Sequence, residues 1–368
     1  MMTVRVPTFD PSPRRIAVFR ALYLGDLICA MPALRALRRR FPRAEVTLIG
    51  LSWAEAFVRR FRASVDRFLE FPGYPGILEV EVVPERIERF LEEQRAYGYN
   101  LALQMHGDGS VSNSFVADLR AQVSLGYRQG ADDRLTVSLP YNPDEHEILR
   151  WLRLGALVGA PGDDVQTEFP TTRIEEAGAG ALLSDGATWK GTRSGPLVGL
   201  HPGAKDPARR WPPERFAAVA DELADHYAAR IVLTGSGGER EITAAVRRAI
   251  RAPALDLAGR TDLGTFAAVI ARLDLLVTND TGASHIAAAT RTPSVILFGP
   301  SRPERWAPLD RARHRVVDAL AGSEADPAAA LRQLPIEPVM AACADGLGVG
   351  RDRGAGRQIR ERRLVAND

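Results

Sequence analysis

The chain has 368 residues and a net charge of only +2 at pH 7, because 48 basic residues are nearly balanced by 46 acidic ones. This balance argues against nucleic acid as a main partner, and the length suffices for two domains that each bury a core. Two cysteines, Cys29 and Cys343, are too few for a disulfide framework, which favours a reducing compartment. Residues 1–15 lack the apolar stretch of a signal peptide, and no run of about 18 uncharged apolar residues predicts a membrane span. We therefore expect a cytoplasmic protein.

Strand-like and helix-like segments alternate through the first half of the chain, a pattern typical of parallel sheets built from βαβ units. The expected strands are 16–20, 45–50, 101–105 and 123–126, and the expected helices are 26–40, 54–61, 84–96, 112–118 and 145–158. The first helix places four apolar residues on one face, namely Ile28, Met31, Leu34 and Leu37. Segment 160–196 is rich in Gly, Pro and Thr, and we expect an irregular joint between two domains there.

The second half repeats the alternation without an evident sequence repeat. The expected strands are 196–201, 230–234, 254–257, 275–278 and 294–298, and the expected helices are 213–228, 239–251, 263–273 and a short one after residue 282. Residues 344–368 are polar and rich in Gly and Arg, so we expect a disordered tail there.

The loop after the first strand contains Gly25 and Asp26. Gly25 allows a ligand to approach the backbone. Asp26 stands where the first helix is expected to begin, and two interpretations fit it. One is a helix N-cap, for which Asp is a favoured residue. The other is a general base at the carboxyl edge of the sheet.

Residues 201–212 form a second loop between a strand and a helix. It carries three cations, Lys205, Arg209 and Arg210, which together suit a diphosphate. Gly203 leaves the backbone accessible there. The alternative is an ordinary solvated loop.

A third loop, residues 234–239, combines glycines with an acid. Gly235 begins a run that would let the backbone cradle a nucleotide, although the spacing fits neither the dinucleotide fingerprint nor the Walker pattern. Glu239 either holds ribose hydroxyls or complements the dipole of the helix that follows.

The fourth loop, Asn279-Asp280-Thr281-Gly282, ends a buried strand and opens a short helix. Thr281 and Gly282 are candidate phosphate ligands, because the amide groups and dipole of a helix N-terminus favour anions. Asp280 would repel phosphate, so it either accepts a hydrogen bond from a sugar hydroxyl or caps the helix. In an open α/β sheet, ligands bind at this edge.

The loops form an ordered set of motifs. They are LGD at 24–26, HPGA and RRWP within 201–212, LTGSGGE at 233–239, GRTDL at 259–263 and NDTGxxHxAAA at 279–289. This set resembles glycosyltransferase family 9, the ADP-heptose:lipopolysaccharide heptosyltransferase family. The resemblance runs over roughly 14–310 and is sparser between 52 and 188. It implies an α/β fold of GT-B type, with two Rossmann-like domains facing across a cleft.

The resemblance also implies domain roles and boundaries. Residues 14–175 would form an N-terminal acceptor-binding domain, and residues 190–340 a C-terminal domain that binds a nucleotide sugar. Asp26 would be the general base, with no metal and no cofactor required. Seven arginines in or just after the first two helices would offer a basic acceptor surface, unless they are ordinary solvated residues: Arg35, Arg38, Arg39, Arg40, Arg59, Arg60 and Arg62.

Donor-binding roles follow from the same motifs. Arg209 stands where the family is usually described as having Lys, and it keeps the charge at the diphosphate with a different reach. Gly203 and Ala204 stand where the family often has hydroxyl side chains, so Lys205 or backbone amides would serve instead. The remaining donor residues are Glu239 at the ribose, Thr261 beside the base, Asp280 at the donor sugar, and Thr281 and Gly282 at the phosphates.

The function implied is that of an inverting, metal-independent glycosyltransferase. It would move a sugar, heptose in the family, from a nucleotide-diphosphate donor that is ADP-linked to an acceptor hydroxyl. The acceptor would be a glycan, a lipid-linked molecule or a small molecule, and a lipid-linked acceptor would bring peripheral contact with the inner face of the membrane. Two alternatives stay open: a nucleotide-sugar epimerase of the same fold, and a non-catalytic nucleotide-sugar-binding protein.

Overall fold

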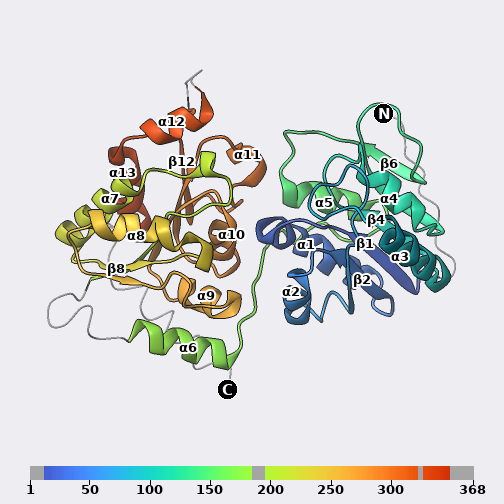
Figure 1. The fold of residues 1–368 in the computed structure, drawn as a ribbon, viewed down its shortest axis with the longest axis horizontal. Coiled ribbons are helices and arrows are strands. Elements are labelled where there is room, and N and C mark those ends of the chain that lie inside the picture. Colours follow the sequence, from blue (N-terminus) through green and yellow to red (C-terminus); the bar gives the residue numbers. More distant parts are fainter. Residues whose placement is uncertain (1–11, 185–194, 322–325, 349–368) are drawn as a thin grey trace. The chain divides into compact units, whose positions relative to one another are not determined.

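A computed structural model describes residues 12–184, 195–321 and 326–348 of the chain (Figure 1). The chain divides into two compact units, Met1–Pro170 and Thr171–Asp368. Each unit is built on one six-stranded sheet in which every neighbouring pair of strands is parallel.

The first unit has the strand order β3-β2-β1-β4-β5-β6. Its strands are β1 (Arg15–Phe19), β2 (Glu45–Gly50), β3 (Arg67–Glu70), β4 (Leu101–Gln104), β5 (Val123–Arg128) and β6 (Val137–Pro140). Its helices are α1 (Leu24–Arg40), α2 (Ala54–Arg60), α3 (Pro84–Tyr97), α4 (Ser112–Asp118) and α5 (Glu147–Ala156). The central strand pairs Ile16 with Val46 on one side and with Leu101 on the other.

The second unit has the strand order β12-β11-β10-β7-β8-β9. Its strands are β7 (Leu197–His201), β8 (Arg230–Leu233), β9 (Ala254–Asp256), β10 (Leu275–Asn279), β11 (Ser294–Phe298) and β12 (His314–Asp318). Its helices are α6 (Arg173–Leu183), η1 (Pro207–Arg209), α7 (Pro213–Tyr227), η2 (Gly237–Glu239), α8 (Arg240–Ala249), α9 (Leu263–Ile270), α10 (Gly282–Ala289), α11 (Pro303–Trp306), α12 (Pro327–Gln333) and α13 (Ile336–Gly346).

Continuous apolar runs account for the central strands. β7, β10 and β11 are buried at every position, as expected for parallel strands covered on both faces. The apolar face predicted for α1 is fully buried as well. Burial of this kind stabilises each unit by about 25 cal/mol for every Å² of apolar surface removed from water.

Three strands were not expected from the sequence: β3, β6 and β12. All three lie at the edge of a sheet. Their sequences, RFLE, VSLP and HRVVD, mix apolar with polar or charged residues, and several of these positions are only partly buried. A strand with a single neighbour does not need the apolar run by which we recognised the central strands.

The prediction of an irregular segment 160–196 was wrong for its middle part, because α6 occupies Arg173–Leu183. Thr172 caps this helix by accepting a hydrogen bond from the Glu175 N–H at 3.3 Å, and the Glu175 carboxylate accepts one from the Thr172 N–H at 2.8 Å. The T-x-x-E spacing of this capping box was visible in the sequence. The predicted tail begins inside α13, and residues 349–368 lie outside the described part of the chain.

Each sheet has one point at which the strand order reverses. It lies between β1 and β4 in the first unit and between β7 and β10 in the second. In open parallel sheets, ligands bind beyond the carboxyl ends of the strands at such a point. Among the helices that the structure describes, none combines the length and apolar character that a membrane span needs.

Candidate active site

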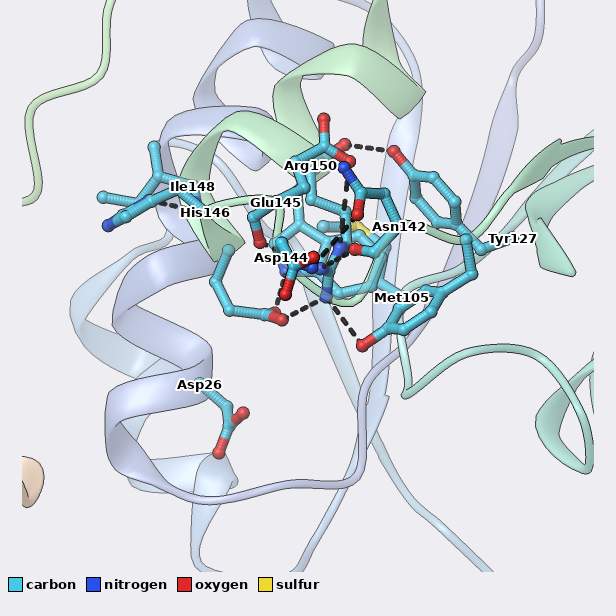
Figure 2. Close-up of polar contacts among 12 residues, drawn as sticks. Asp26, Met105, Tyr127, Asn142, Asp144, Glu145, His146, Ile148 and Arg150 are labelled. Carbon is cyan, nitrogen blue, oxygen red and sulfur yellow. Dashed lines mark hydrogen bonds and ion pairs between the residues drawn. The ribbon is translucent and has the colours of Figure 1, made fainter. Parts of the chain in front are cut away.

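Asp26 lies in the first turn of α1, just beyond the carboxyl end of β1 (Figure 2). The helix begins at Leu24, two residues earlier than predicted, so Asp26 is the third helical residue and not the N-cap. Its carboxylate still serves the helix end, because Oδ2 accepts a hydrogen bond from the Tyr23 N–H at 3.3 Å. The Asp26 side chain is 18% exposed and therefore remains accessible to a ligand.

Arg20 lies beneath Asp26 at the end of β1 and is 1% exposed. Its Nη2 is 3.2 Å from Asp26 Oδ1, and its Nε donates to the Asp26 carbonyl oxygen at 2.8 Å. A buried guanidinium requires such partners, because an unpaired buried charge is strongly unfavourable. Sequence reasoning treated Arg20 only as the end of a strand, although a charged residue closing an apolar run was a signal.

Arg20 also joins Asp26 to a buried network on α5. Its Nη2 lies 3.4 Å from Glu147 Oε2, and that oxygen accepts a hydrogen bond from Trp151 Nε1 at 3.0 Å. The Trp151 ring lies below the guanidinium, 4.7 Å away. Glu147 is in turn paired with Arg150, around which Figure 2 draws the contacts on α5. None of these residues was singled out from the sequence.

His106 follows β4 and stacks on Phe19 with ring centroids 5.0 Å apart. Burial, together with the nearby charge of Arg20, lowers the pKa of His106 to about 4. The ring is therefore neutral at pH 7. Its Nε2 lies 3.9 Å from Glu79 Oε2.

In the second unit, Arg209 and Asp280 come together although they are 71 positions apart in the sequence. Arg209 Nη1 lies 3.2 Å from Asp280 Oδ2, which also accepts a hydrogen bond from Ser301 Oγ at 2.6 Å. Asp280 is 3% exposed, whereas the Arg209 side chain is 39% exposed and can still meet a ligand. Arg209 Nε is buried and has no hydrogen-bond partner among the described residues.

The helix α10 begins where the sequence predicted. Thr281 is its N-cap residue in extended conformation, and Gly282 is its first residue. Asp280 is therefore not the cap. Both Thr281 and Gly282 are partly exposed. His285, inside α10, is buried, and its ring lies edge-on to Trp306.

Asn279 connects the two loops that carry these groups. It is fully buried, and its Nδ2 donates to the carbonyl oxygens of Pro202 and Gly203 at 2.8 and 3.3 Å. Its Oδ1 accepts a hydrogen bond from the Trp211 N–H at 3.1 Å. The side chain thereby ties the loop after β7 to the end of β10. From the sequence, Asn279 is only the residue that ends a buried strand.

Glu239 packs against Gly203. A Cβ atom added to Gly203 would lie 2.0 Å from Glu239 Oε1, so only glycine leaves room for the carboxylate. Glu239 Oε2 accepts a hydrogen bond from the Ser236 N–H at 2.7 Å and lies 3.9 Å from His201 Nε2. Burial lowers the pKa of His201. Burial alone would raise the pKa of Glu239, but His201 and the Ser236 hydrogen bonds outweigh it and leave that pKa below its ordinary value.

Thr261 lies in the loop between β9 and α9 and is partly buried. This loop is beside the one after β8, because the Gly259 N–H donates to the carbonyl oxygen of Gly235 at 2.9 Å. Lys205 is exposed on its loop. Arg210 folds back, with Nε donating to the Ala204 carbonyl oxygen at 2.8 Å, and so supports the loop's shape.

Most arginines of α1 and α2 have structural partners within the first unit. Arg35 pairs with Asp164 and Glu168, and Arg39 pairs with Asp163. The others make these contacts: Arg38 with Asp66, Arg40 with the Val158 carbonyl oxygen, Arg59 with Glu55 and Arg60 with the Pro170 carbonyl oxygen. The contacts of Arg35, Arg39, Arg40 and Arg60 fasten residues 158–170 of the first unit to α1 and α2. No group of three or more metal-ligating side chains is found in the part of the chain that the structure describes.

The family model of glycosyltransferase family 9 (heptosyltransferase) matches residues 87–325 of this chain. A relative in sequence is lipopolysaccharide heptosyltransferase 2 of Salmonella typhimurium. It is 27% identical over 327 residues, which cover 84% of this chain and 89% of the relative.

Two solved structures show the same fold. One is a glycosyltransferase of family 9 from Veillonella parvula, with a TM-score of 0.74 and 20% identity over 91% of this chain and 98% of the other. The second is the ADP-heptose lipopolysaccharide heptosyltransferase II of Escherichia coli, with a TM-score of 0.68 and 22% identity over 91% and 99%. These likenesses confirm the predicted GT-B fold of two Rossmann-like domains.

Proposed function

The chain belongs to glycosyltransferase family 9, the heptosyltransferase family, and from that premise we propose that it transfers heptose from an ADP-linked donor to a hydroxyl group of a lipopolysaccharide acceptor. We further propose that the transfer inverts the anomeric centre and needs no metal ion. The names of the relatives support heptose, ADP and the acceptor class. The observation that carries the proposal from this chain's own residues is the meeting of Arg209 with the start of α10 at the strand-order reversal of the second unit.

The diphosphate of the donor would bind between these two groups. Arg209 offers an accessible guanidinium whose buried Nε has no partner among the described residues, and a phosphate oxygen would satisfy it. Thr281 and Gly282 offer the amide groups of a helix N-terminus, which favour phosphate. Asp280 would hold Arg209 in place, and its role at the donor sugar stays a prediction.

The nucleoside would extend from the diphosphate toward the loops after β8 and β9. Glu239 keeps a carboxylate that accepts hydrogen bonds, because its pKa lies below the ordinary value. Ribose hydroxyls are suitable donors to it. Thr261 would lie beside the base, since its loop neighbours the loop of Gly235.

In the first unit, Asp26 would act as the general base. Its carboxylate takes the proton of the acceptor hydroxyl while the acceptor oxygen bonds to the anomeric carbon of the sugar. The bond from that carbon to the diphosphate oxygen breaks, and ADP leaves with the electron pair. Attack from the face opposite the leaving group inverts the centre. Arg209 and the first amides of α10 would stabilise the charge that develops on the leaving diphosphate.

The test is a transfer assay with two substrates. The donor is ADP-heptose, and the acceptor is a truncated lipopolysaccharide that lacks its outer heptose. Mass spectrometry should show the acceptor gain one heptose, and NMR of the product should show the anomeric configuration opposite to the donor's. The reaction should proceed unchanged in EDTA. Turnover of the donor without any acceptor would point to an epimerase, and tight ADP binding without turnover of any donor would point to a binding protein.

A further inference from the structure

A row of alternating charges runs inward from Asp26 through Arg20, Glu147 and Arg150. The Nη2 atom of Arg20 stands between two carboxylates, 3.2 Å from Asp26 Oδ1 and 3.4 Å from Glu147 Oε2. Glu147 has a second cation in Arg150, which is fully buried and whose Nη2 donates to the Asn142 and Glu145 carbonyl oxygens at 2.6 and 2.9 Å. The two inner charges of the row, Arg20 and Glu147, are thus each shared between two neighbours.

The guanidinium of Arg20 is held from three sides. Its Nε donates to the backbone of α1, its Nη1 donates to the Met105 carbonyl oxygen after β4, and its Nη2 faces α5. The Trp151 ring beneath it closes a fourth side. An arginine fixed in this way has one orientation, so the oxygen that it binds on Asp26 is fixed as well.

We propose that Arg20 is the positioning residue of Asp26, and that Glu147 weakens its hold on Asp26 by competing for the same Nη2 atom. The inference rests on the proposed function, in which Asp26 is the base. Arg20 fixes the Asp26 carboxylate and keeps it charged. Glu147 interacts with the same guanidinium and so weakens the attraction between Arg20 and Asp26. The Asp26 carboxylate can therefore still accept a proton.

The contacts of Asp26 agree with a moderate hold. A strong charge-assisted hydrogen bond from an arginine to a carboxylate has a length of about 2.7–2.9 Å. Arg20 Nη2 lies 3.2 Å from Asp26 Oδ1, which is longer, and Oδ2 accepts a hydrogen bond from the Tyr23 N–H at 3.3 Å.

The other titratable groups around Arg20 do not take over the role of Glu147. His106 is neutral at pH 7, because burial and the charge of Arg20 lower its pKa to about 4. Glu79 lies 3.9 Å from His106 Nε2, and Arg150 and Glu145 lie on the far side of Glu147. Glu147 is therefore the carboxylate that competes directly with Asp26 for Arg20.

The competition predicts opposite effects of two neutral substitutions. In Arg20→Gln, Asp26 loses its cation, and its titration midpoint should rise by about one pH unit. In Glu147→Gln, Arg20 turns wholly to Asp26, and the midpoint should fall. Gln retains an oxygen for the Trp151 N–H, so the packing is preserved. The double variant removes one charge of each sign and leaves Arg150 with Glu145, and its midpoint should lie between those of the two single variants.

The midpoint is measured directly by carbon-13 NMR of the labelled Asp carboxyl groups, with Asp26→Asn identifying the signal. This readout does not depend on transfer activity. In turnover assays, the acid limb of kcat/KM should move in the same two directions, while the KM for the donor stays within about twofold. Arg20→Lys keeps the positive charge but lacks the planar guanidinium whose several N–H groups fix the orientation of Arg20. It should therefore leave the acid limb of kcat/KM in place and lower kcat by about tenfold.

Equal shifts in both single variants, or a midpoint of the folded double variant outside the range set by the two single variants, would overturn the inference and leave Arg20 and Glu147 as structural residues. That result, with Asp26→Asn inactive, would leave the proposed function standing. Full activity of Asp26→Asn would overturn both. Thermal unfolding of each variant identifies any loss that comes from misfolding.

Discussion

The two units place their candidate groups at equivalent points of their sheets but support them differently. In the first unit, Asp26 rests on buried ions, with Arg20 and Glu147 almost completely inside the protein. In the second unit, an uncharged amide, Asn279, supports the loops, and the cation Arg209 stays partly exposed. A group that must gain and lose a proton needs neighbours that set its charge. A group that must bind an anion needs its own charge to remain accessible.

The largest test of this comparison is Asp26→Asn. Removing the base should lower turnover by about 10²–10⁴-fold, the usual contribution of general base catalysis. Donor affinity should stay unchanged, because the proposed donor groups belong to the second unit. Asn still accepts the Tyr23 N–H, so the free energy of unfolding should change by only about 1 kcal/mol.

Steady-state turnover, calorimetric titration with ADP and thermal unfolding measure these three quantities. An Asp26→Asn enzyme with normal turnover would show that Asp26 only caps α1, and the two units would then not differ as we describe.

The next largest effect is expected for Arg209→Ala. Loss of an accessible charged donor should weaken ADP binding by about 1.5–3 kcal/mol. Lys205→Ala is the matched control, since Lys205 lies on the same loop and is exposed. It should cost less. Calorimetric titration of both variants decides, and an affinity of Arg209→Ala equal to wild type would end the assignment of Arg209 to the diphosphate.

A smaller effect is expected for Gly203→Ala. The added Cβ would lie 2.0 Å from Glu239 Oε1 and would push the carboxylate away from the ribose. ADP should bind about tenfold more weakly, in the range of 1–3 kcal/mol that overpacking costs. Gly237→Ala is the control on the neighbouring loop, because a Cβ there would meet nothing within 4 Å. If both variants bind ADP alike, the contact between Gly203 and Glu239 does not matter for the nucleotide.

The smallest expected effect is the loss of folding stability at acidic pH that comes from His314. Burial lowers the pKa of His314 to about 4, and the ring bonds to Ser294 Oγ at 2.8 Å. A histidine whose pKa is lower in the folded state contributes stability above its unfolded pKa of about 6.5, and that stability is lost as the pH falls toward 4. Between pH 7 and pH 5 the loss should be about 1–2 kcal/mol for this residue.

Urea unfolding of wild type and His314→Gln at both pH values measures this loss. The variant should lose less stability on acidification. The partly buried His106 should contribute a similar loss in the first unit, where its pKa is also about 4. An acid sensitivity that is identical with and without the His314 imidazole would contradict the expectation.

Much of this arrangement was predictable, and the rest was not for physical reasons. Glycines and polar residues between apolar runs mark the loops at the carboxyl ends of β1, β7, β8 and β10 in the sequence. Because the strands are parallel, the loops of each sheet lie at one edge. Local patterns also located α1, α7 and α10. The edge strands β3, β6 and β12 were not predicted from the sequence, because a strand paired on one side tolerates polar residues at many positions.

Side-chain partners across long separations were not predictable. Arg20 meets Glu147 across 127 positions, and Asn279 meets Trp211 across 68. No local spacing encodes such pairs. A buried charge at the end of an apolar strand signals only that some partner exists. The arginines of α1 and α2 show the opposite case, since a run that suggested an acceptor surface is largely engaged within its own unit.

The shared guanidinium of Arg20 also has a consequence for inheritance. Replacing Arg20 alone leaves Glu147 with Arg150, and replacing Glu147 alone leaves Arg20 with Asp26, so each change leaves a buried charge with one partner fewer. Breaking a buried pair costs up to about 3–5 kcal/mol. When one of these two residues is substituted during evolution, we therefore expect the other to be substituted within a few further mutations. Relatives of this chain should carry the two together or lack both, and an ancestor that acquired them would have done so in a tolerant background or through a less buried intermediate.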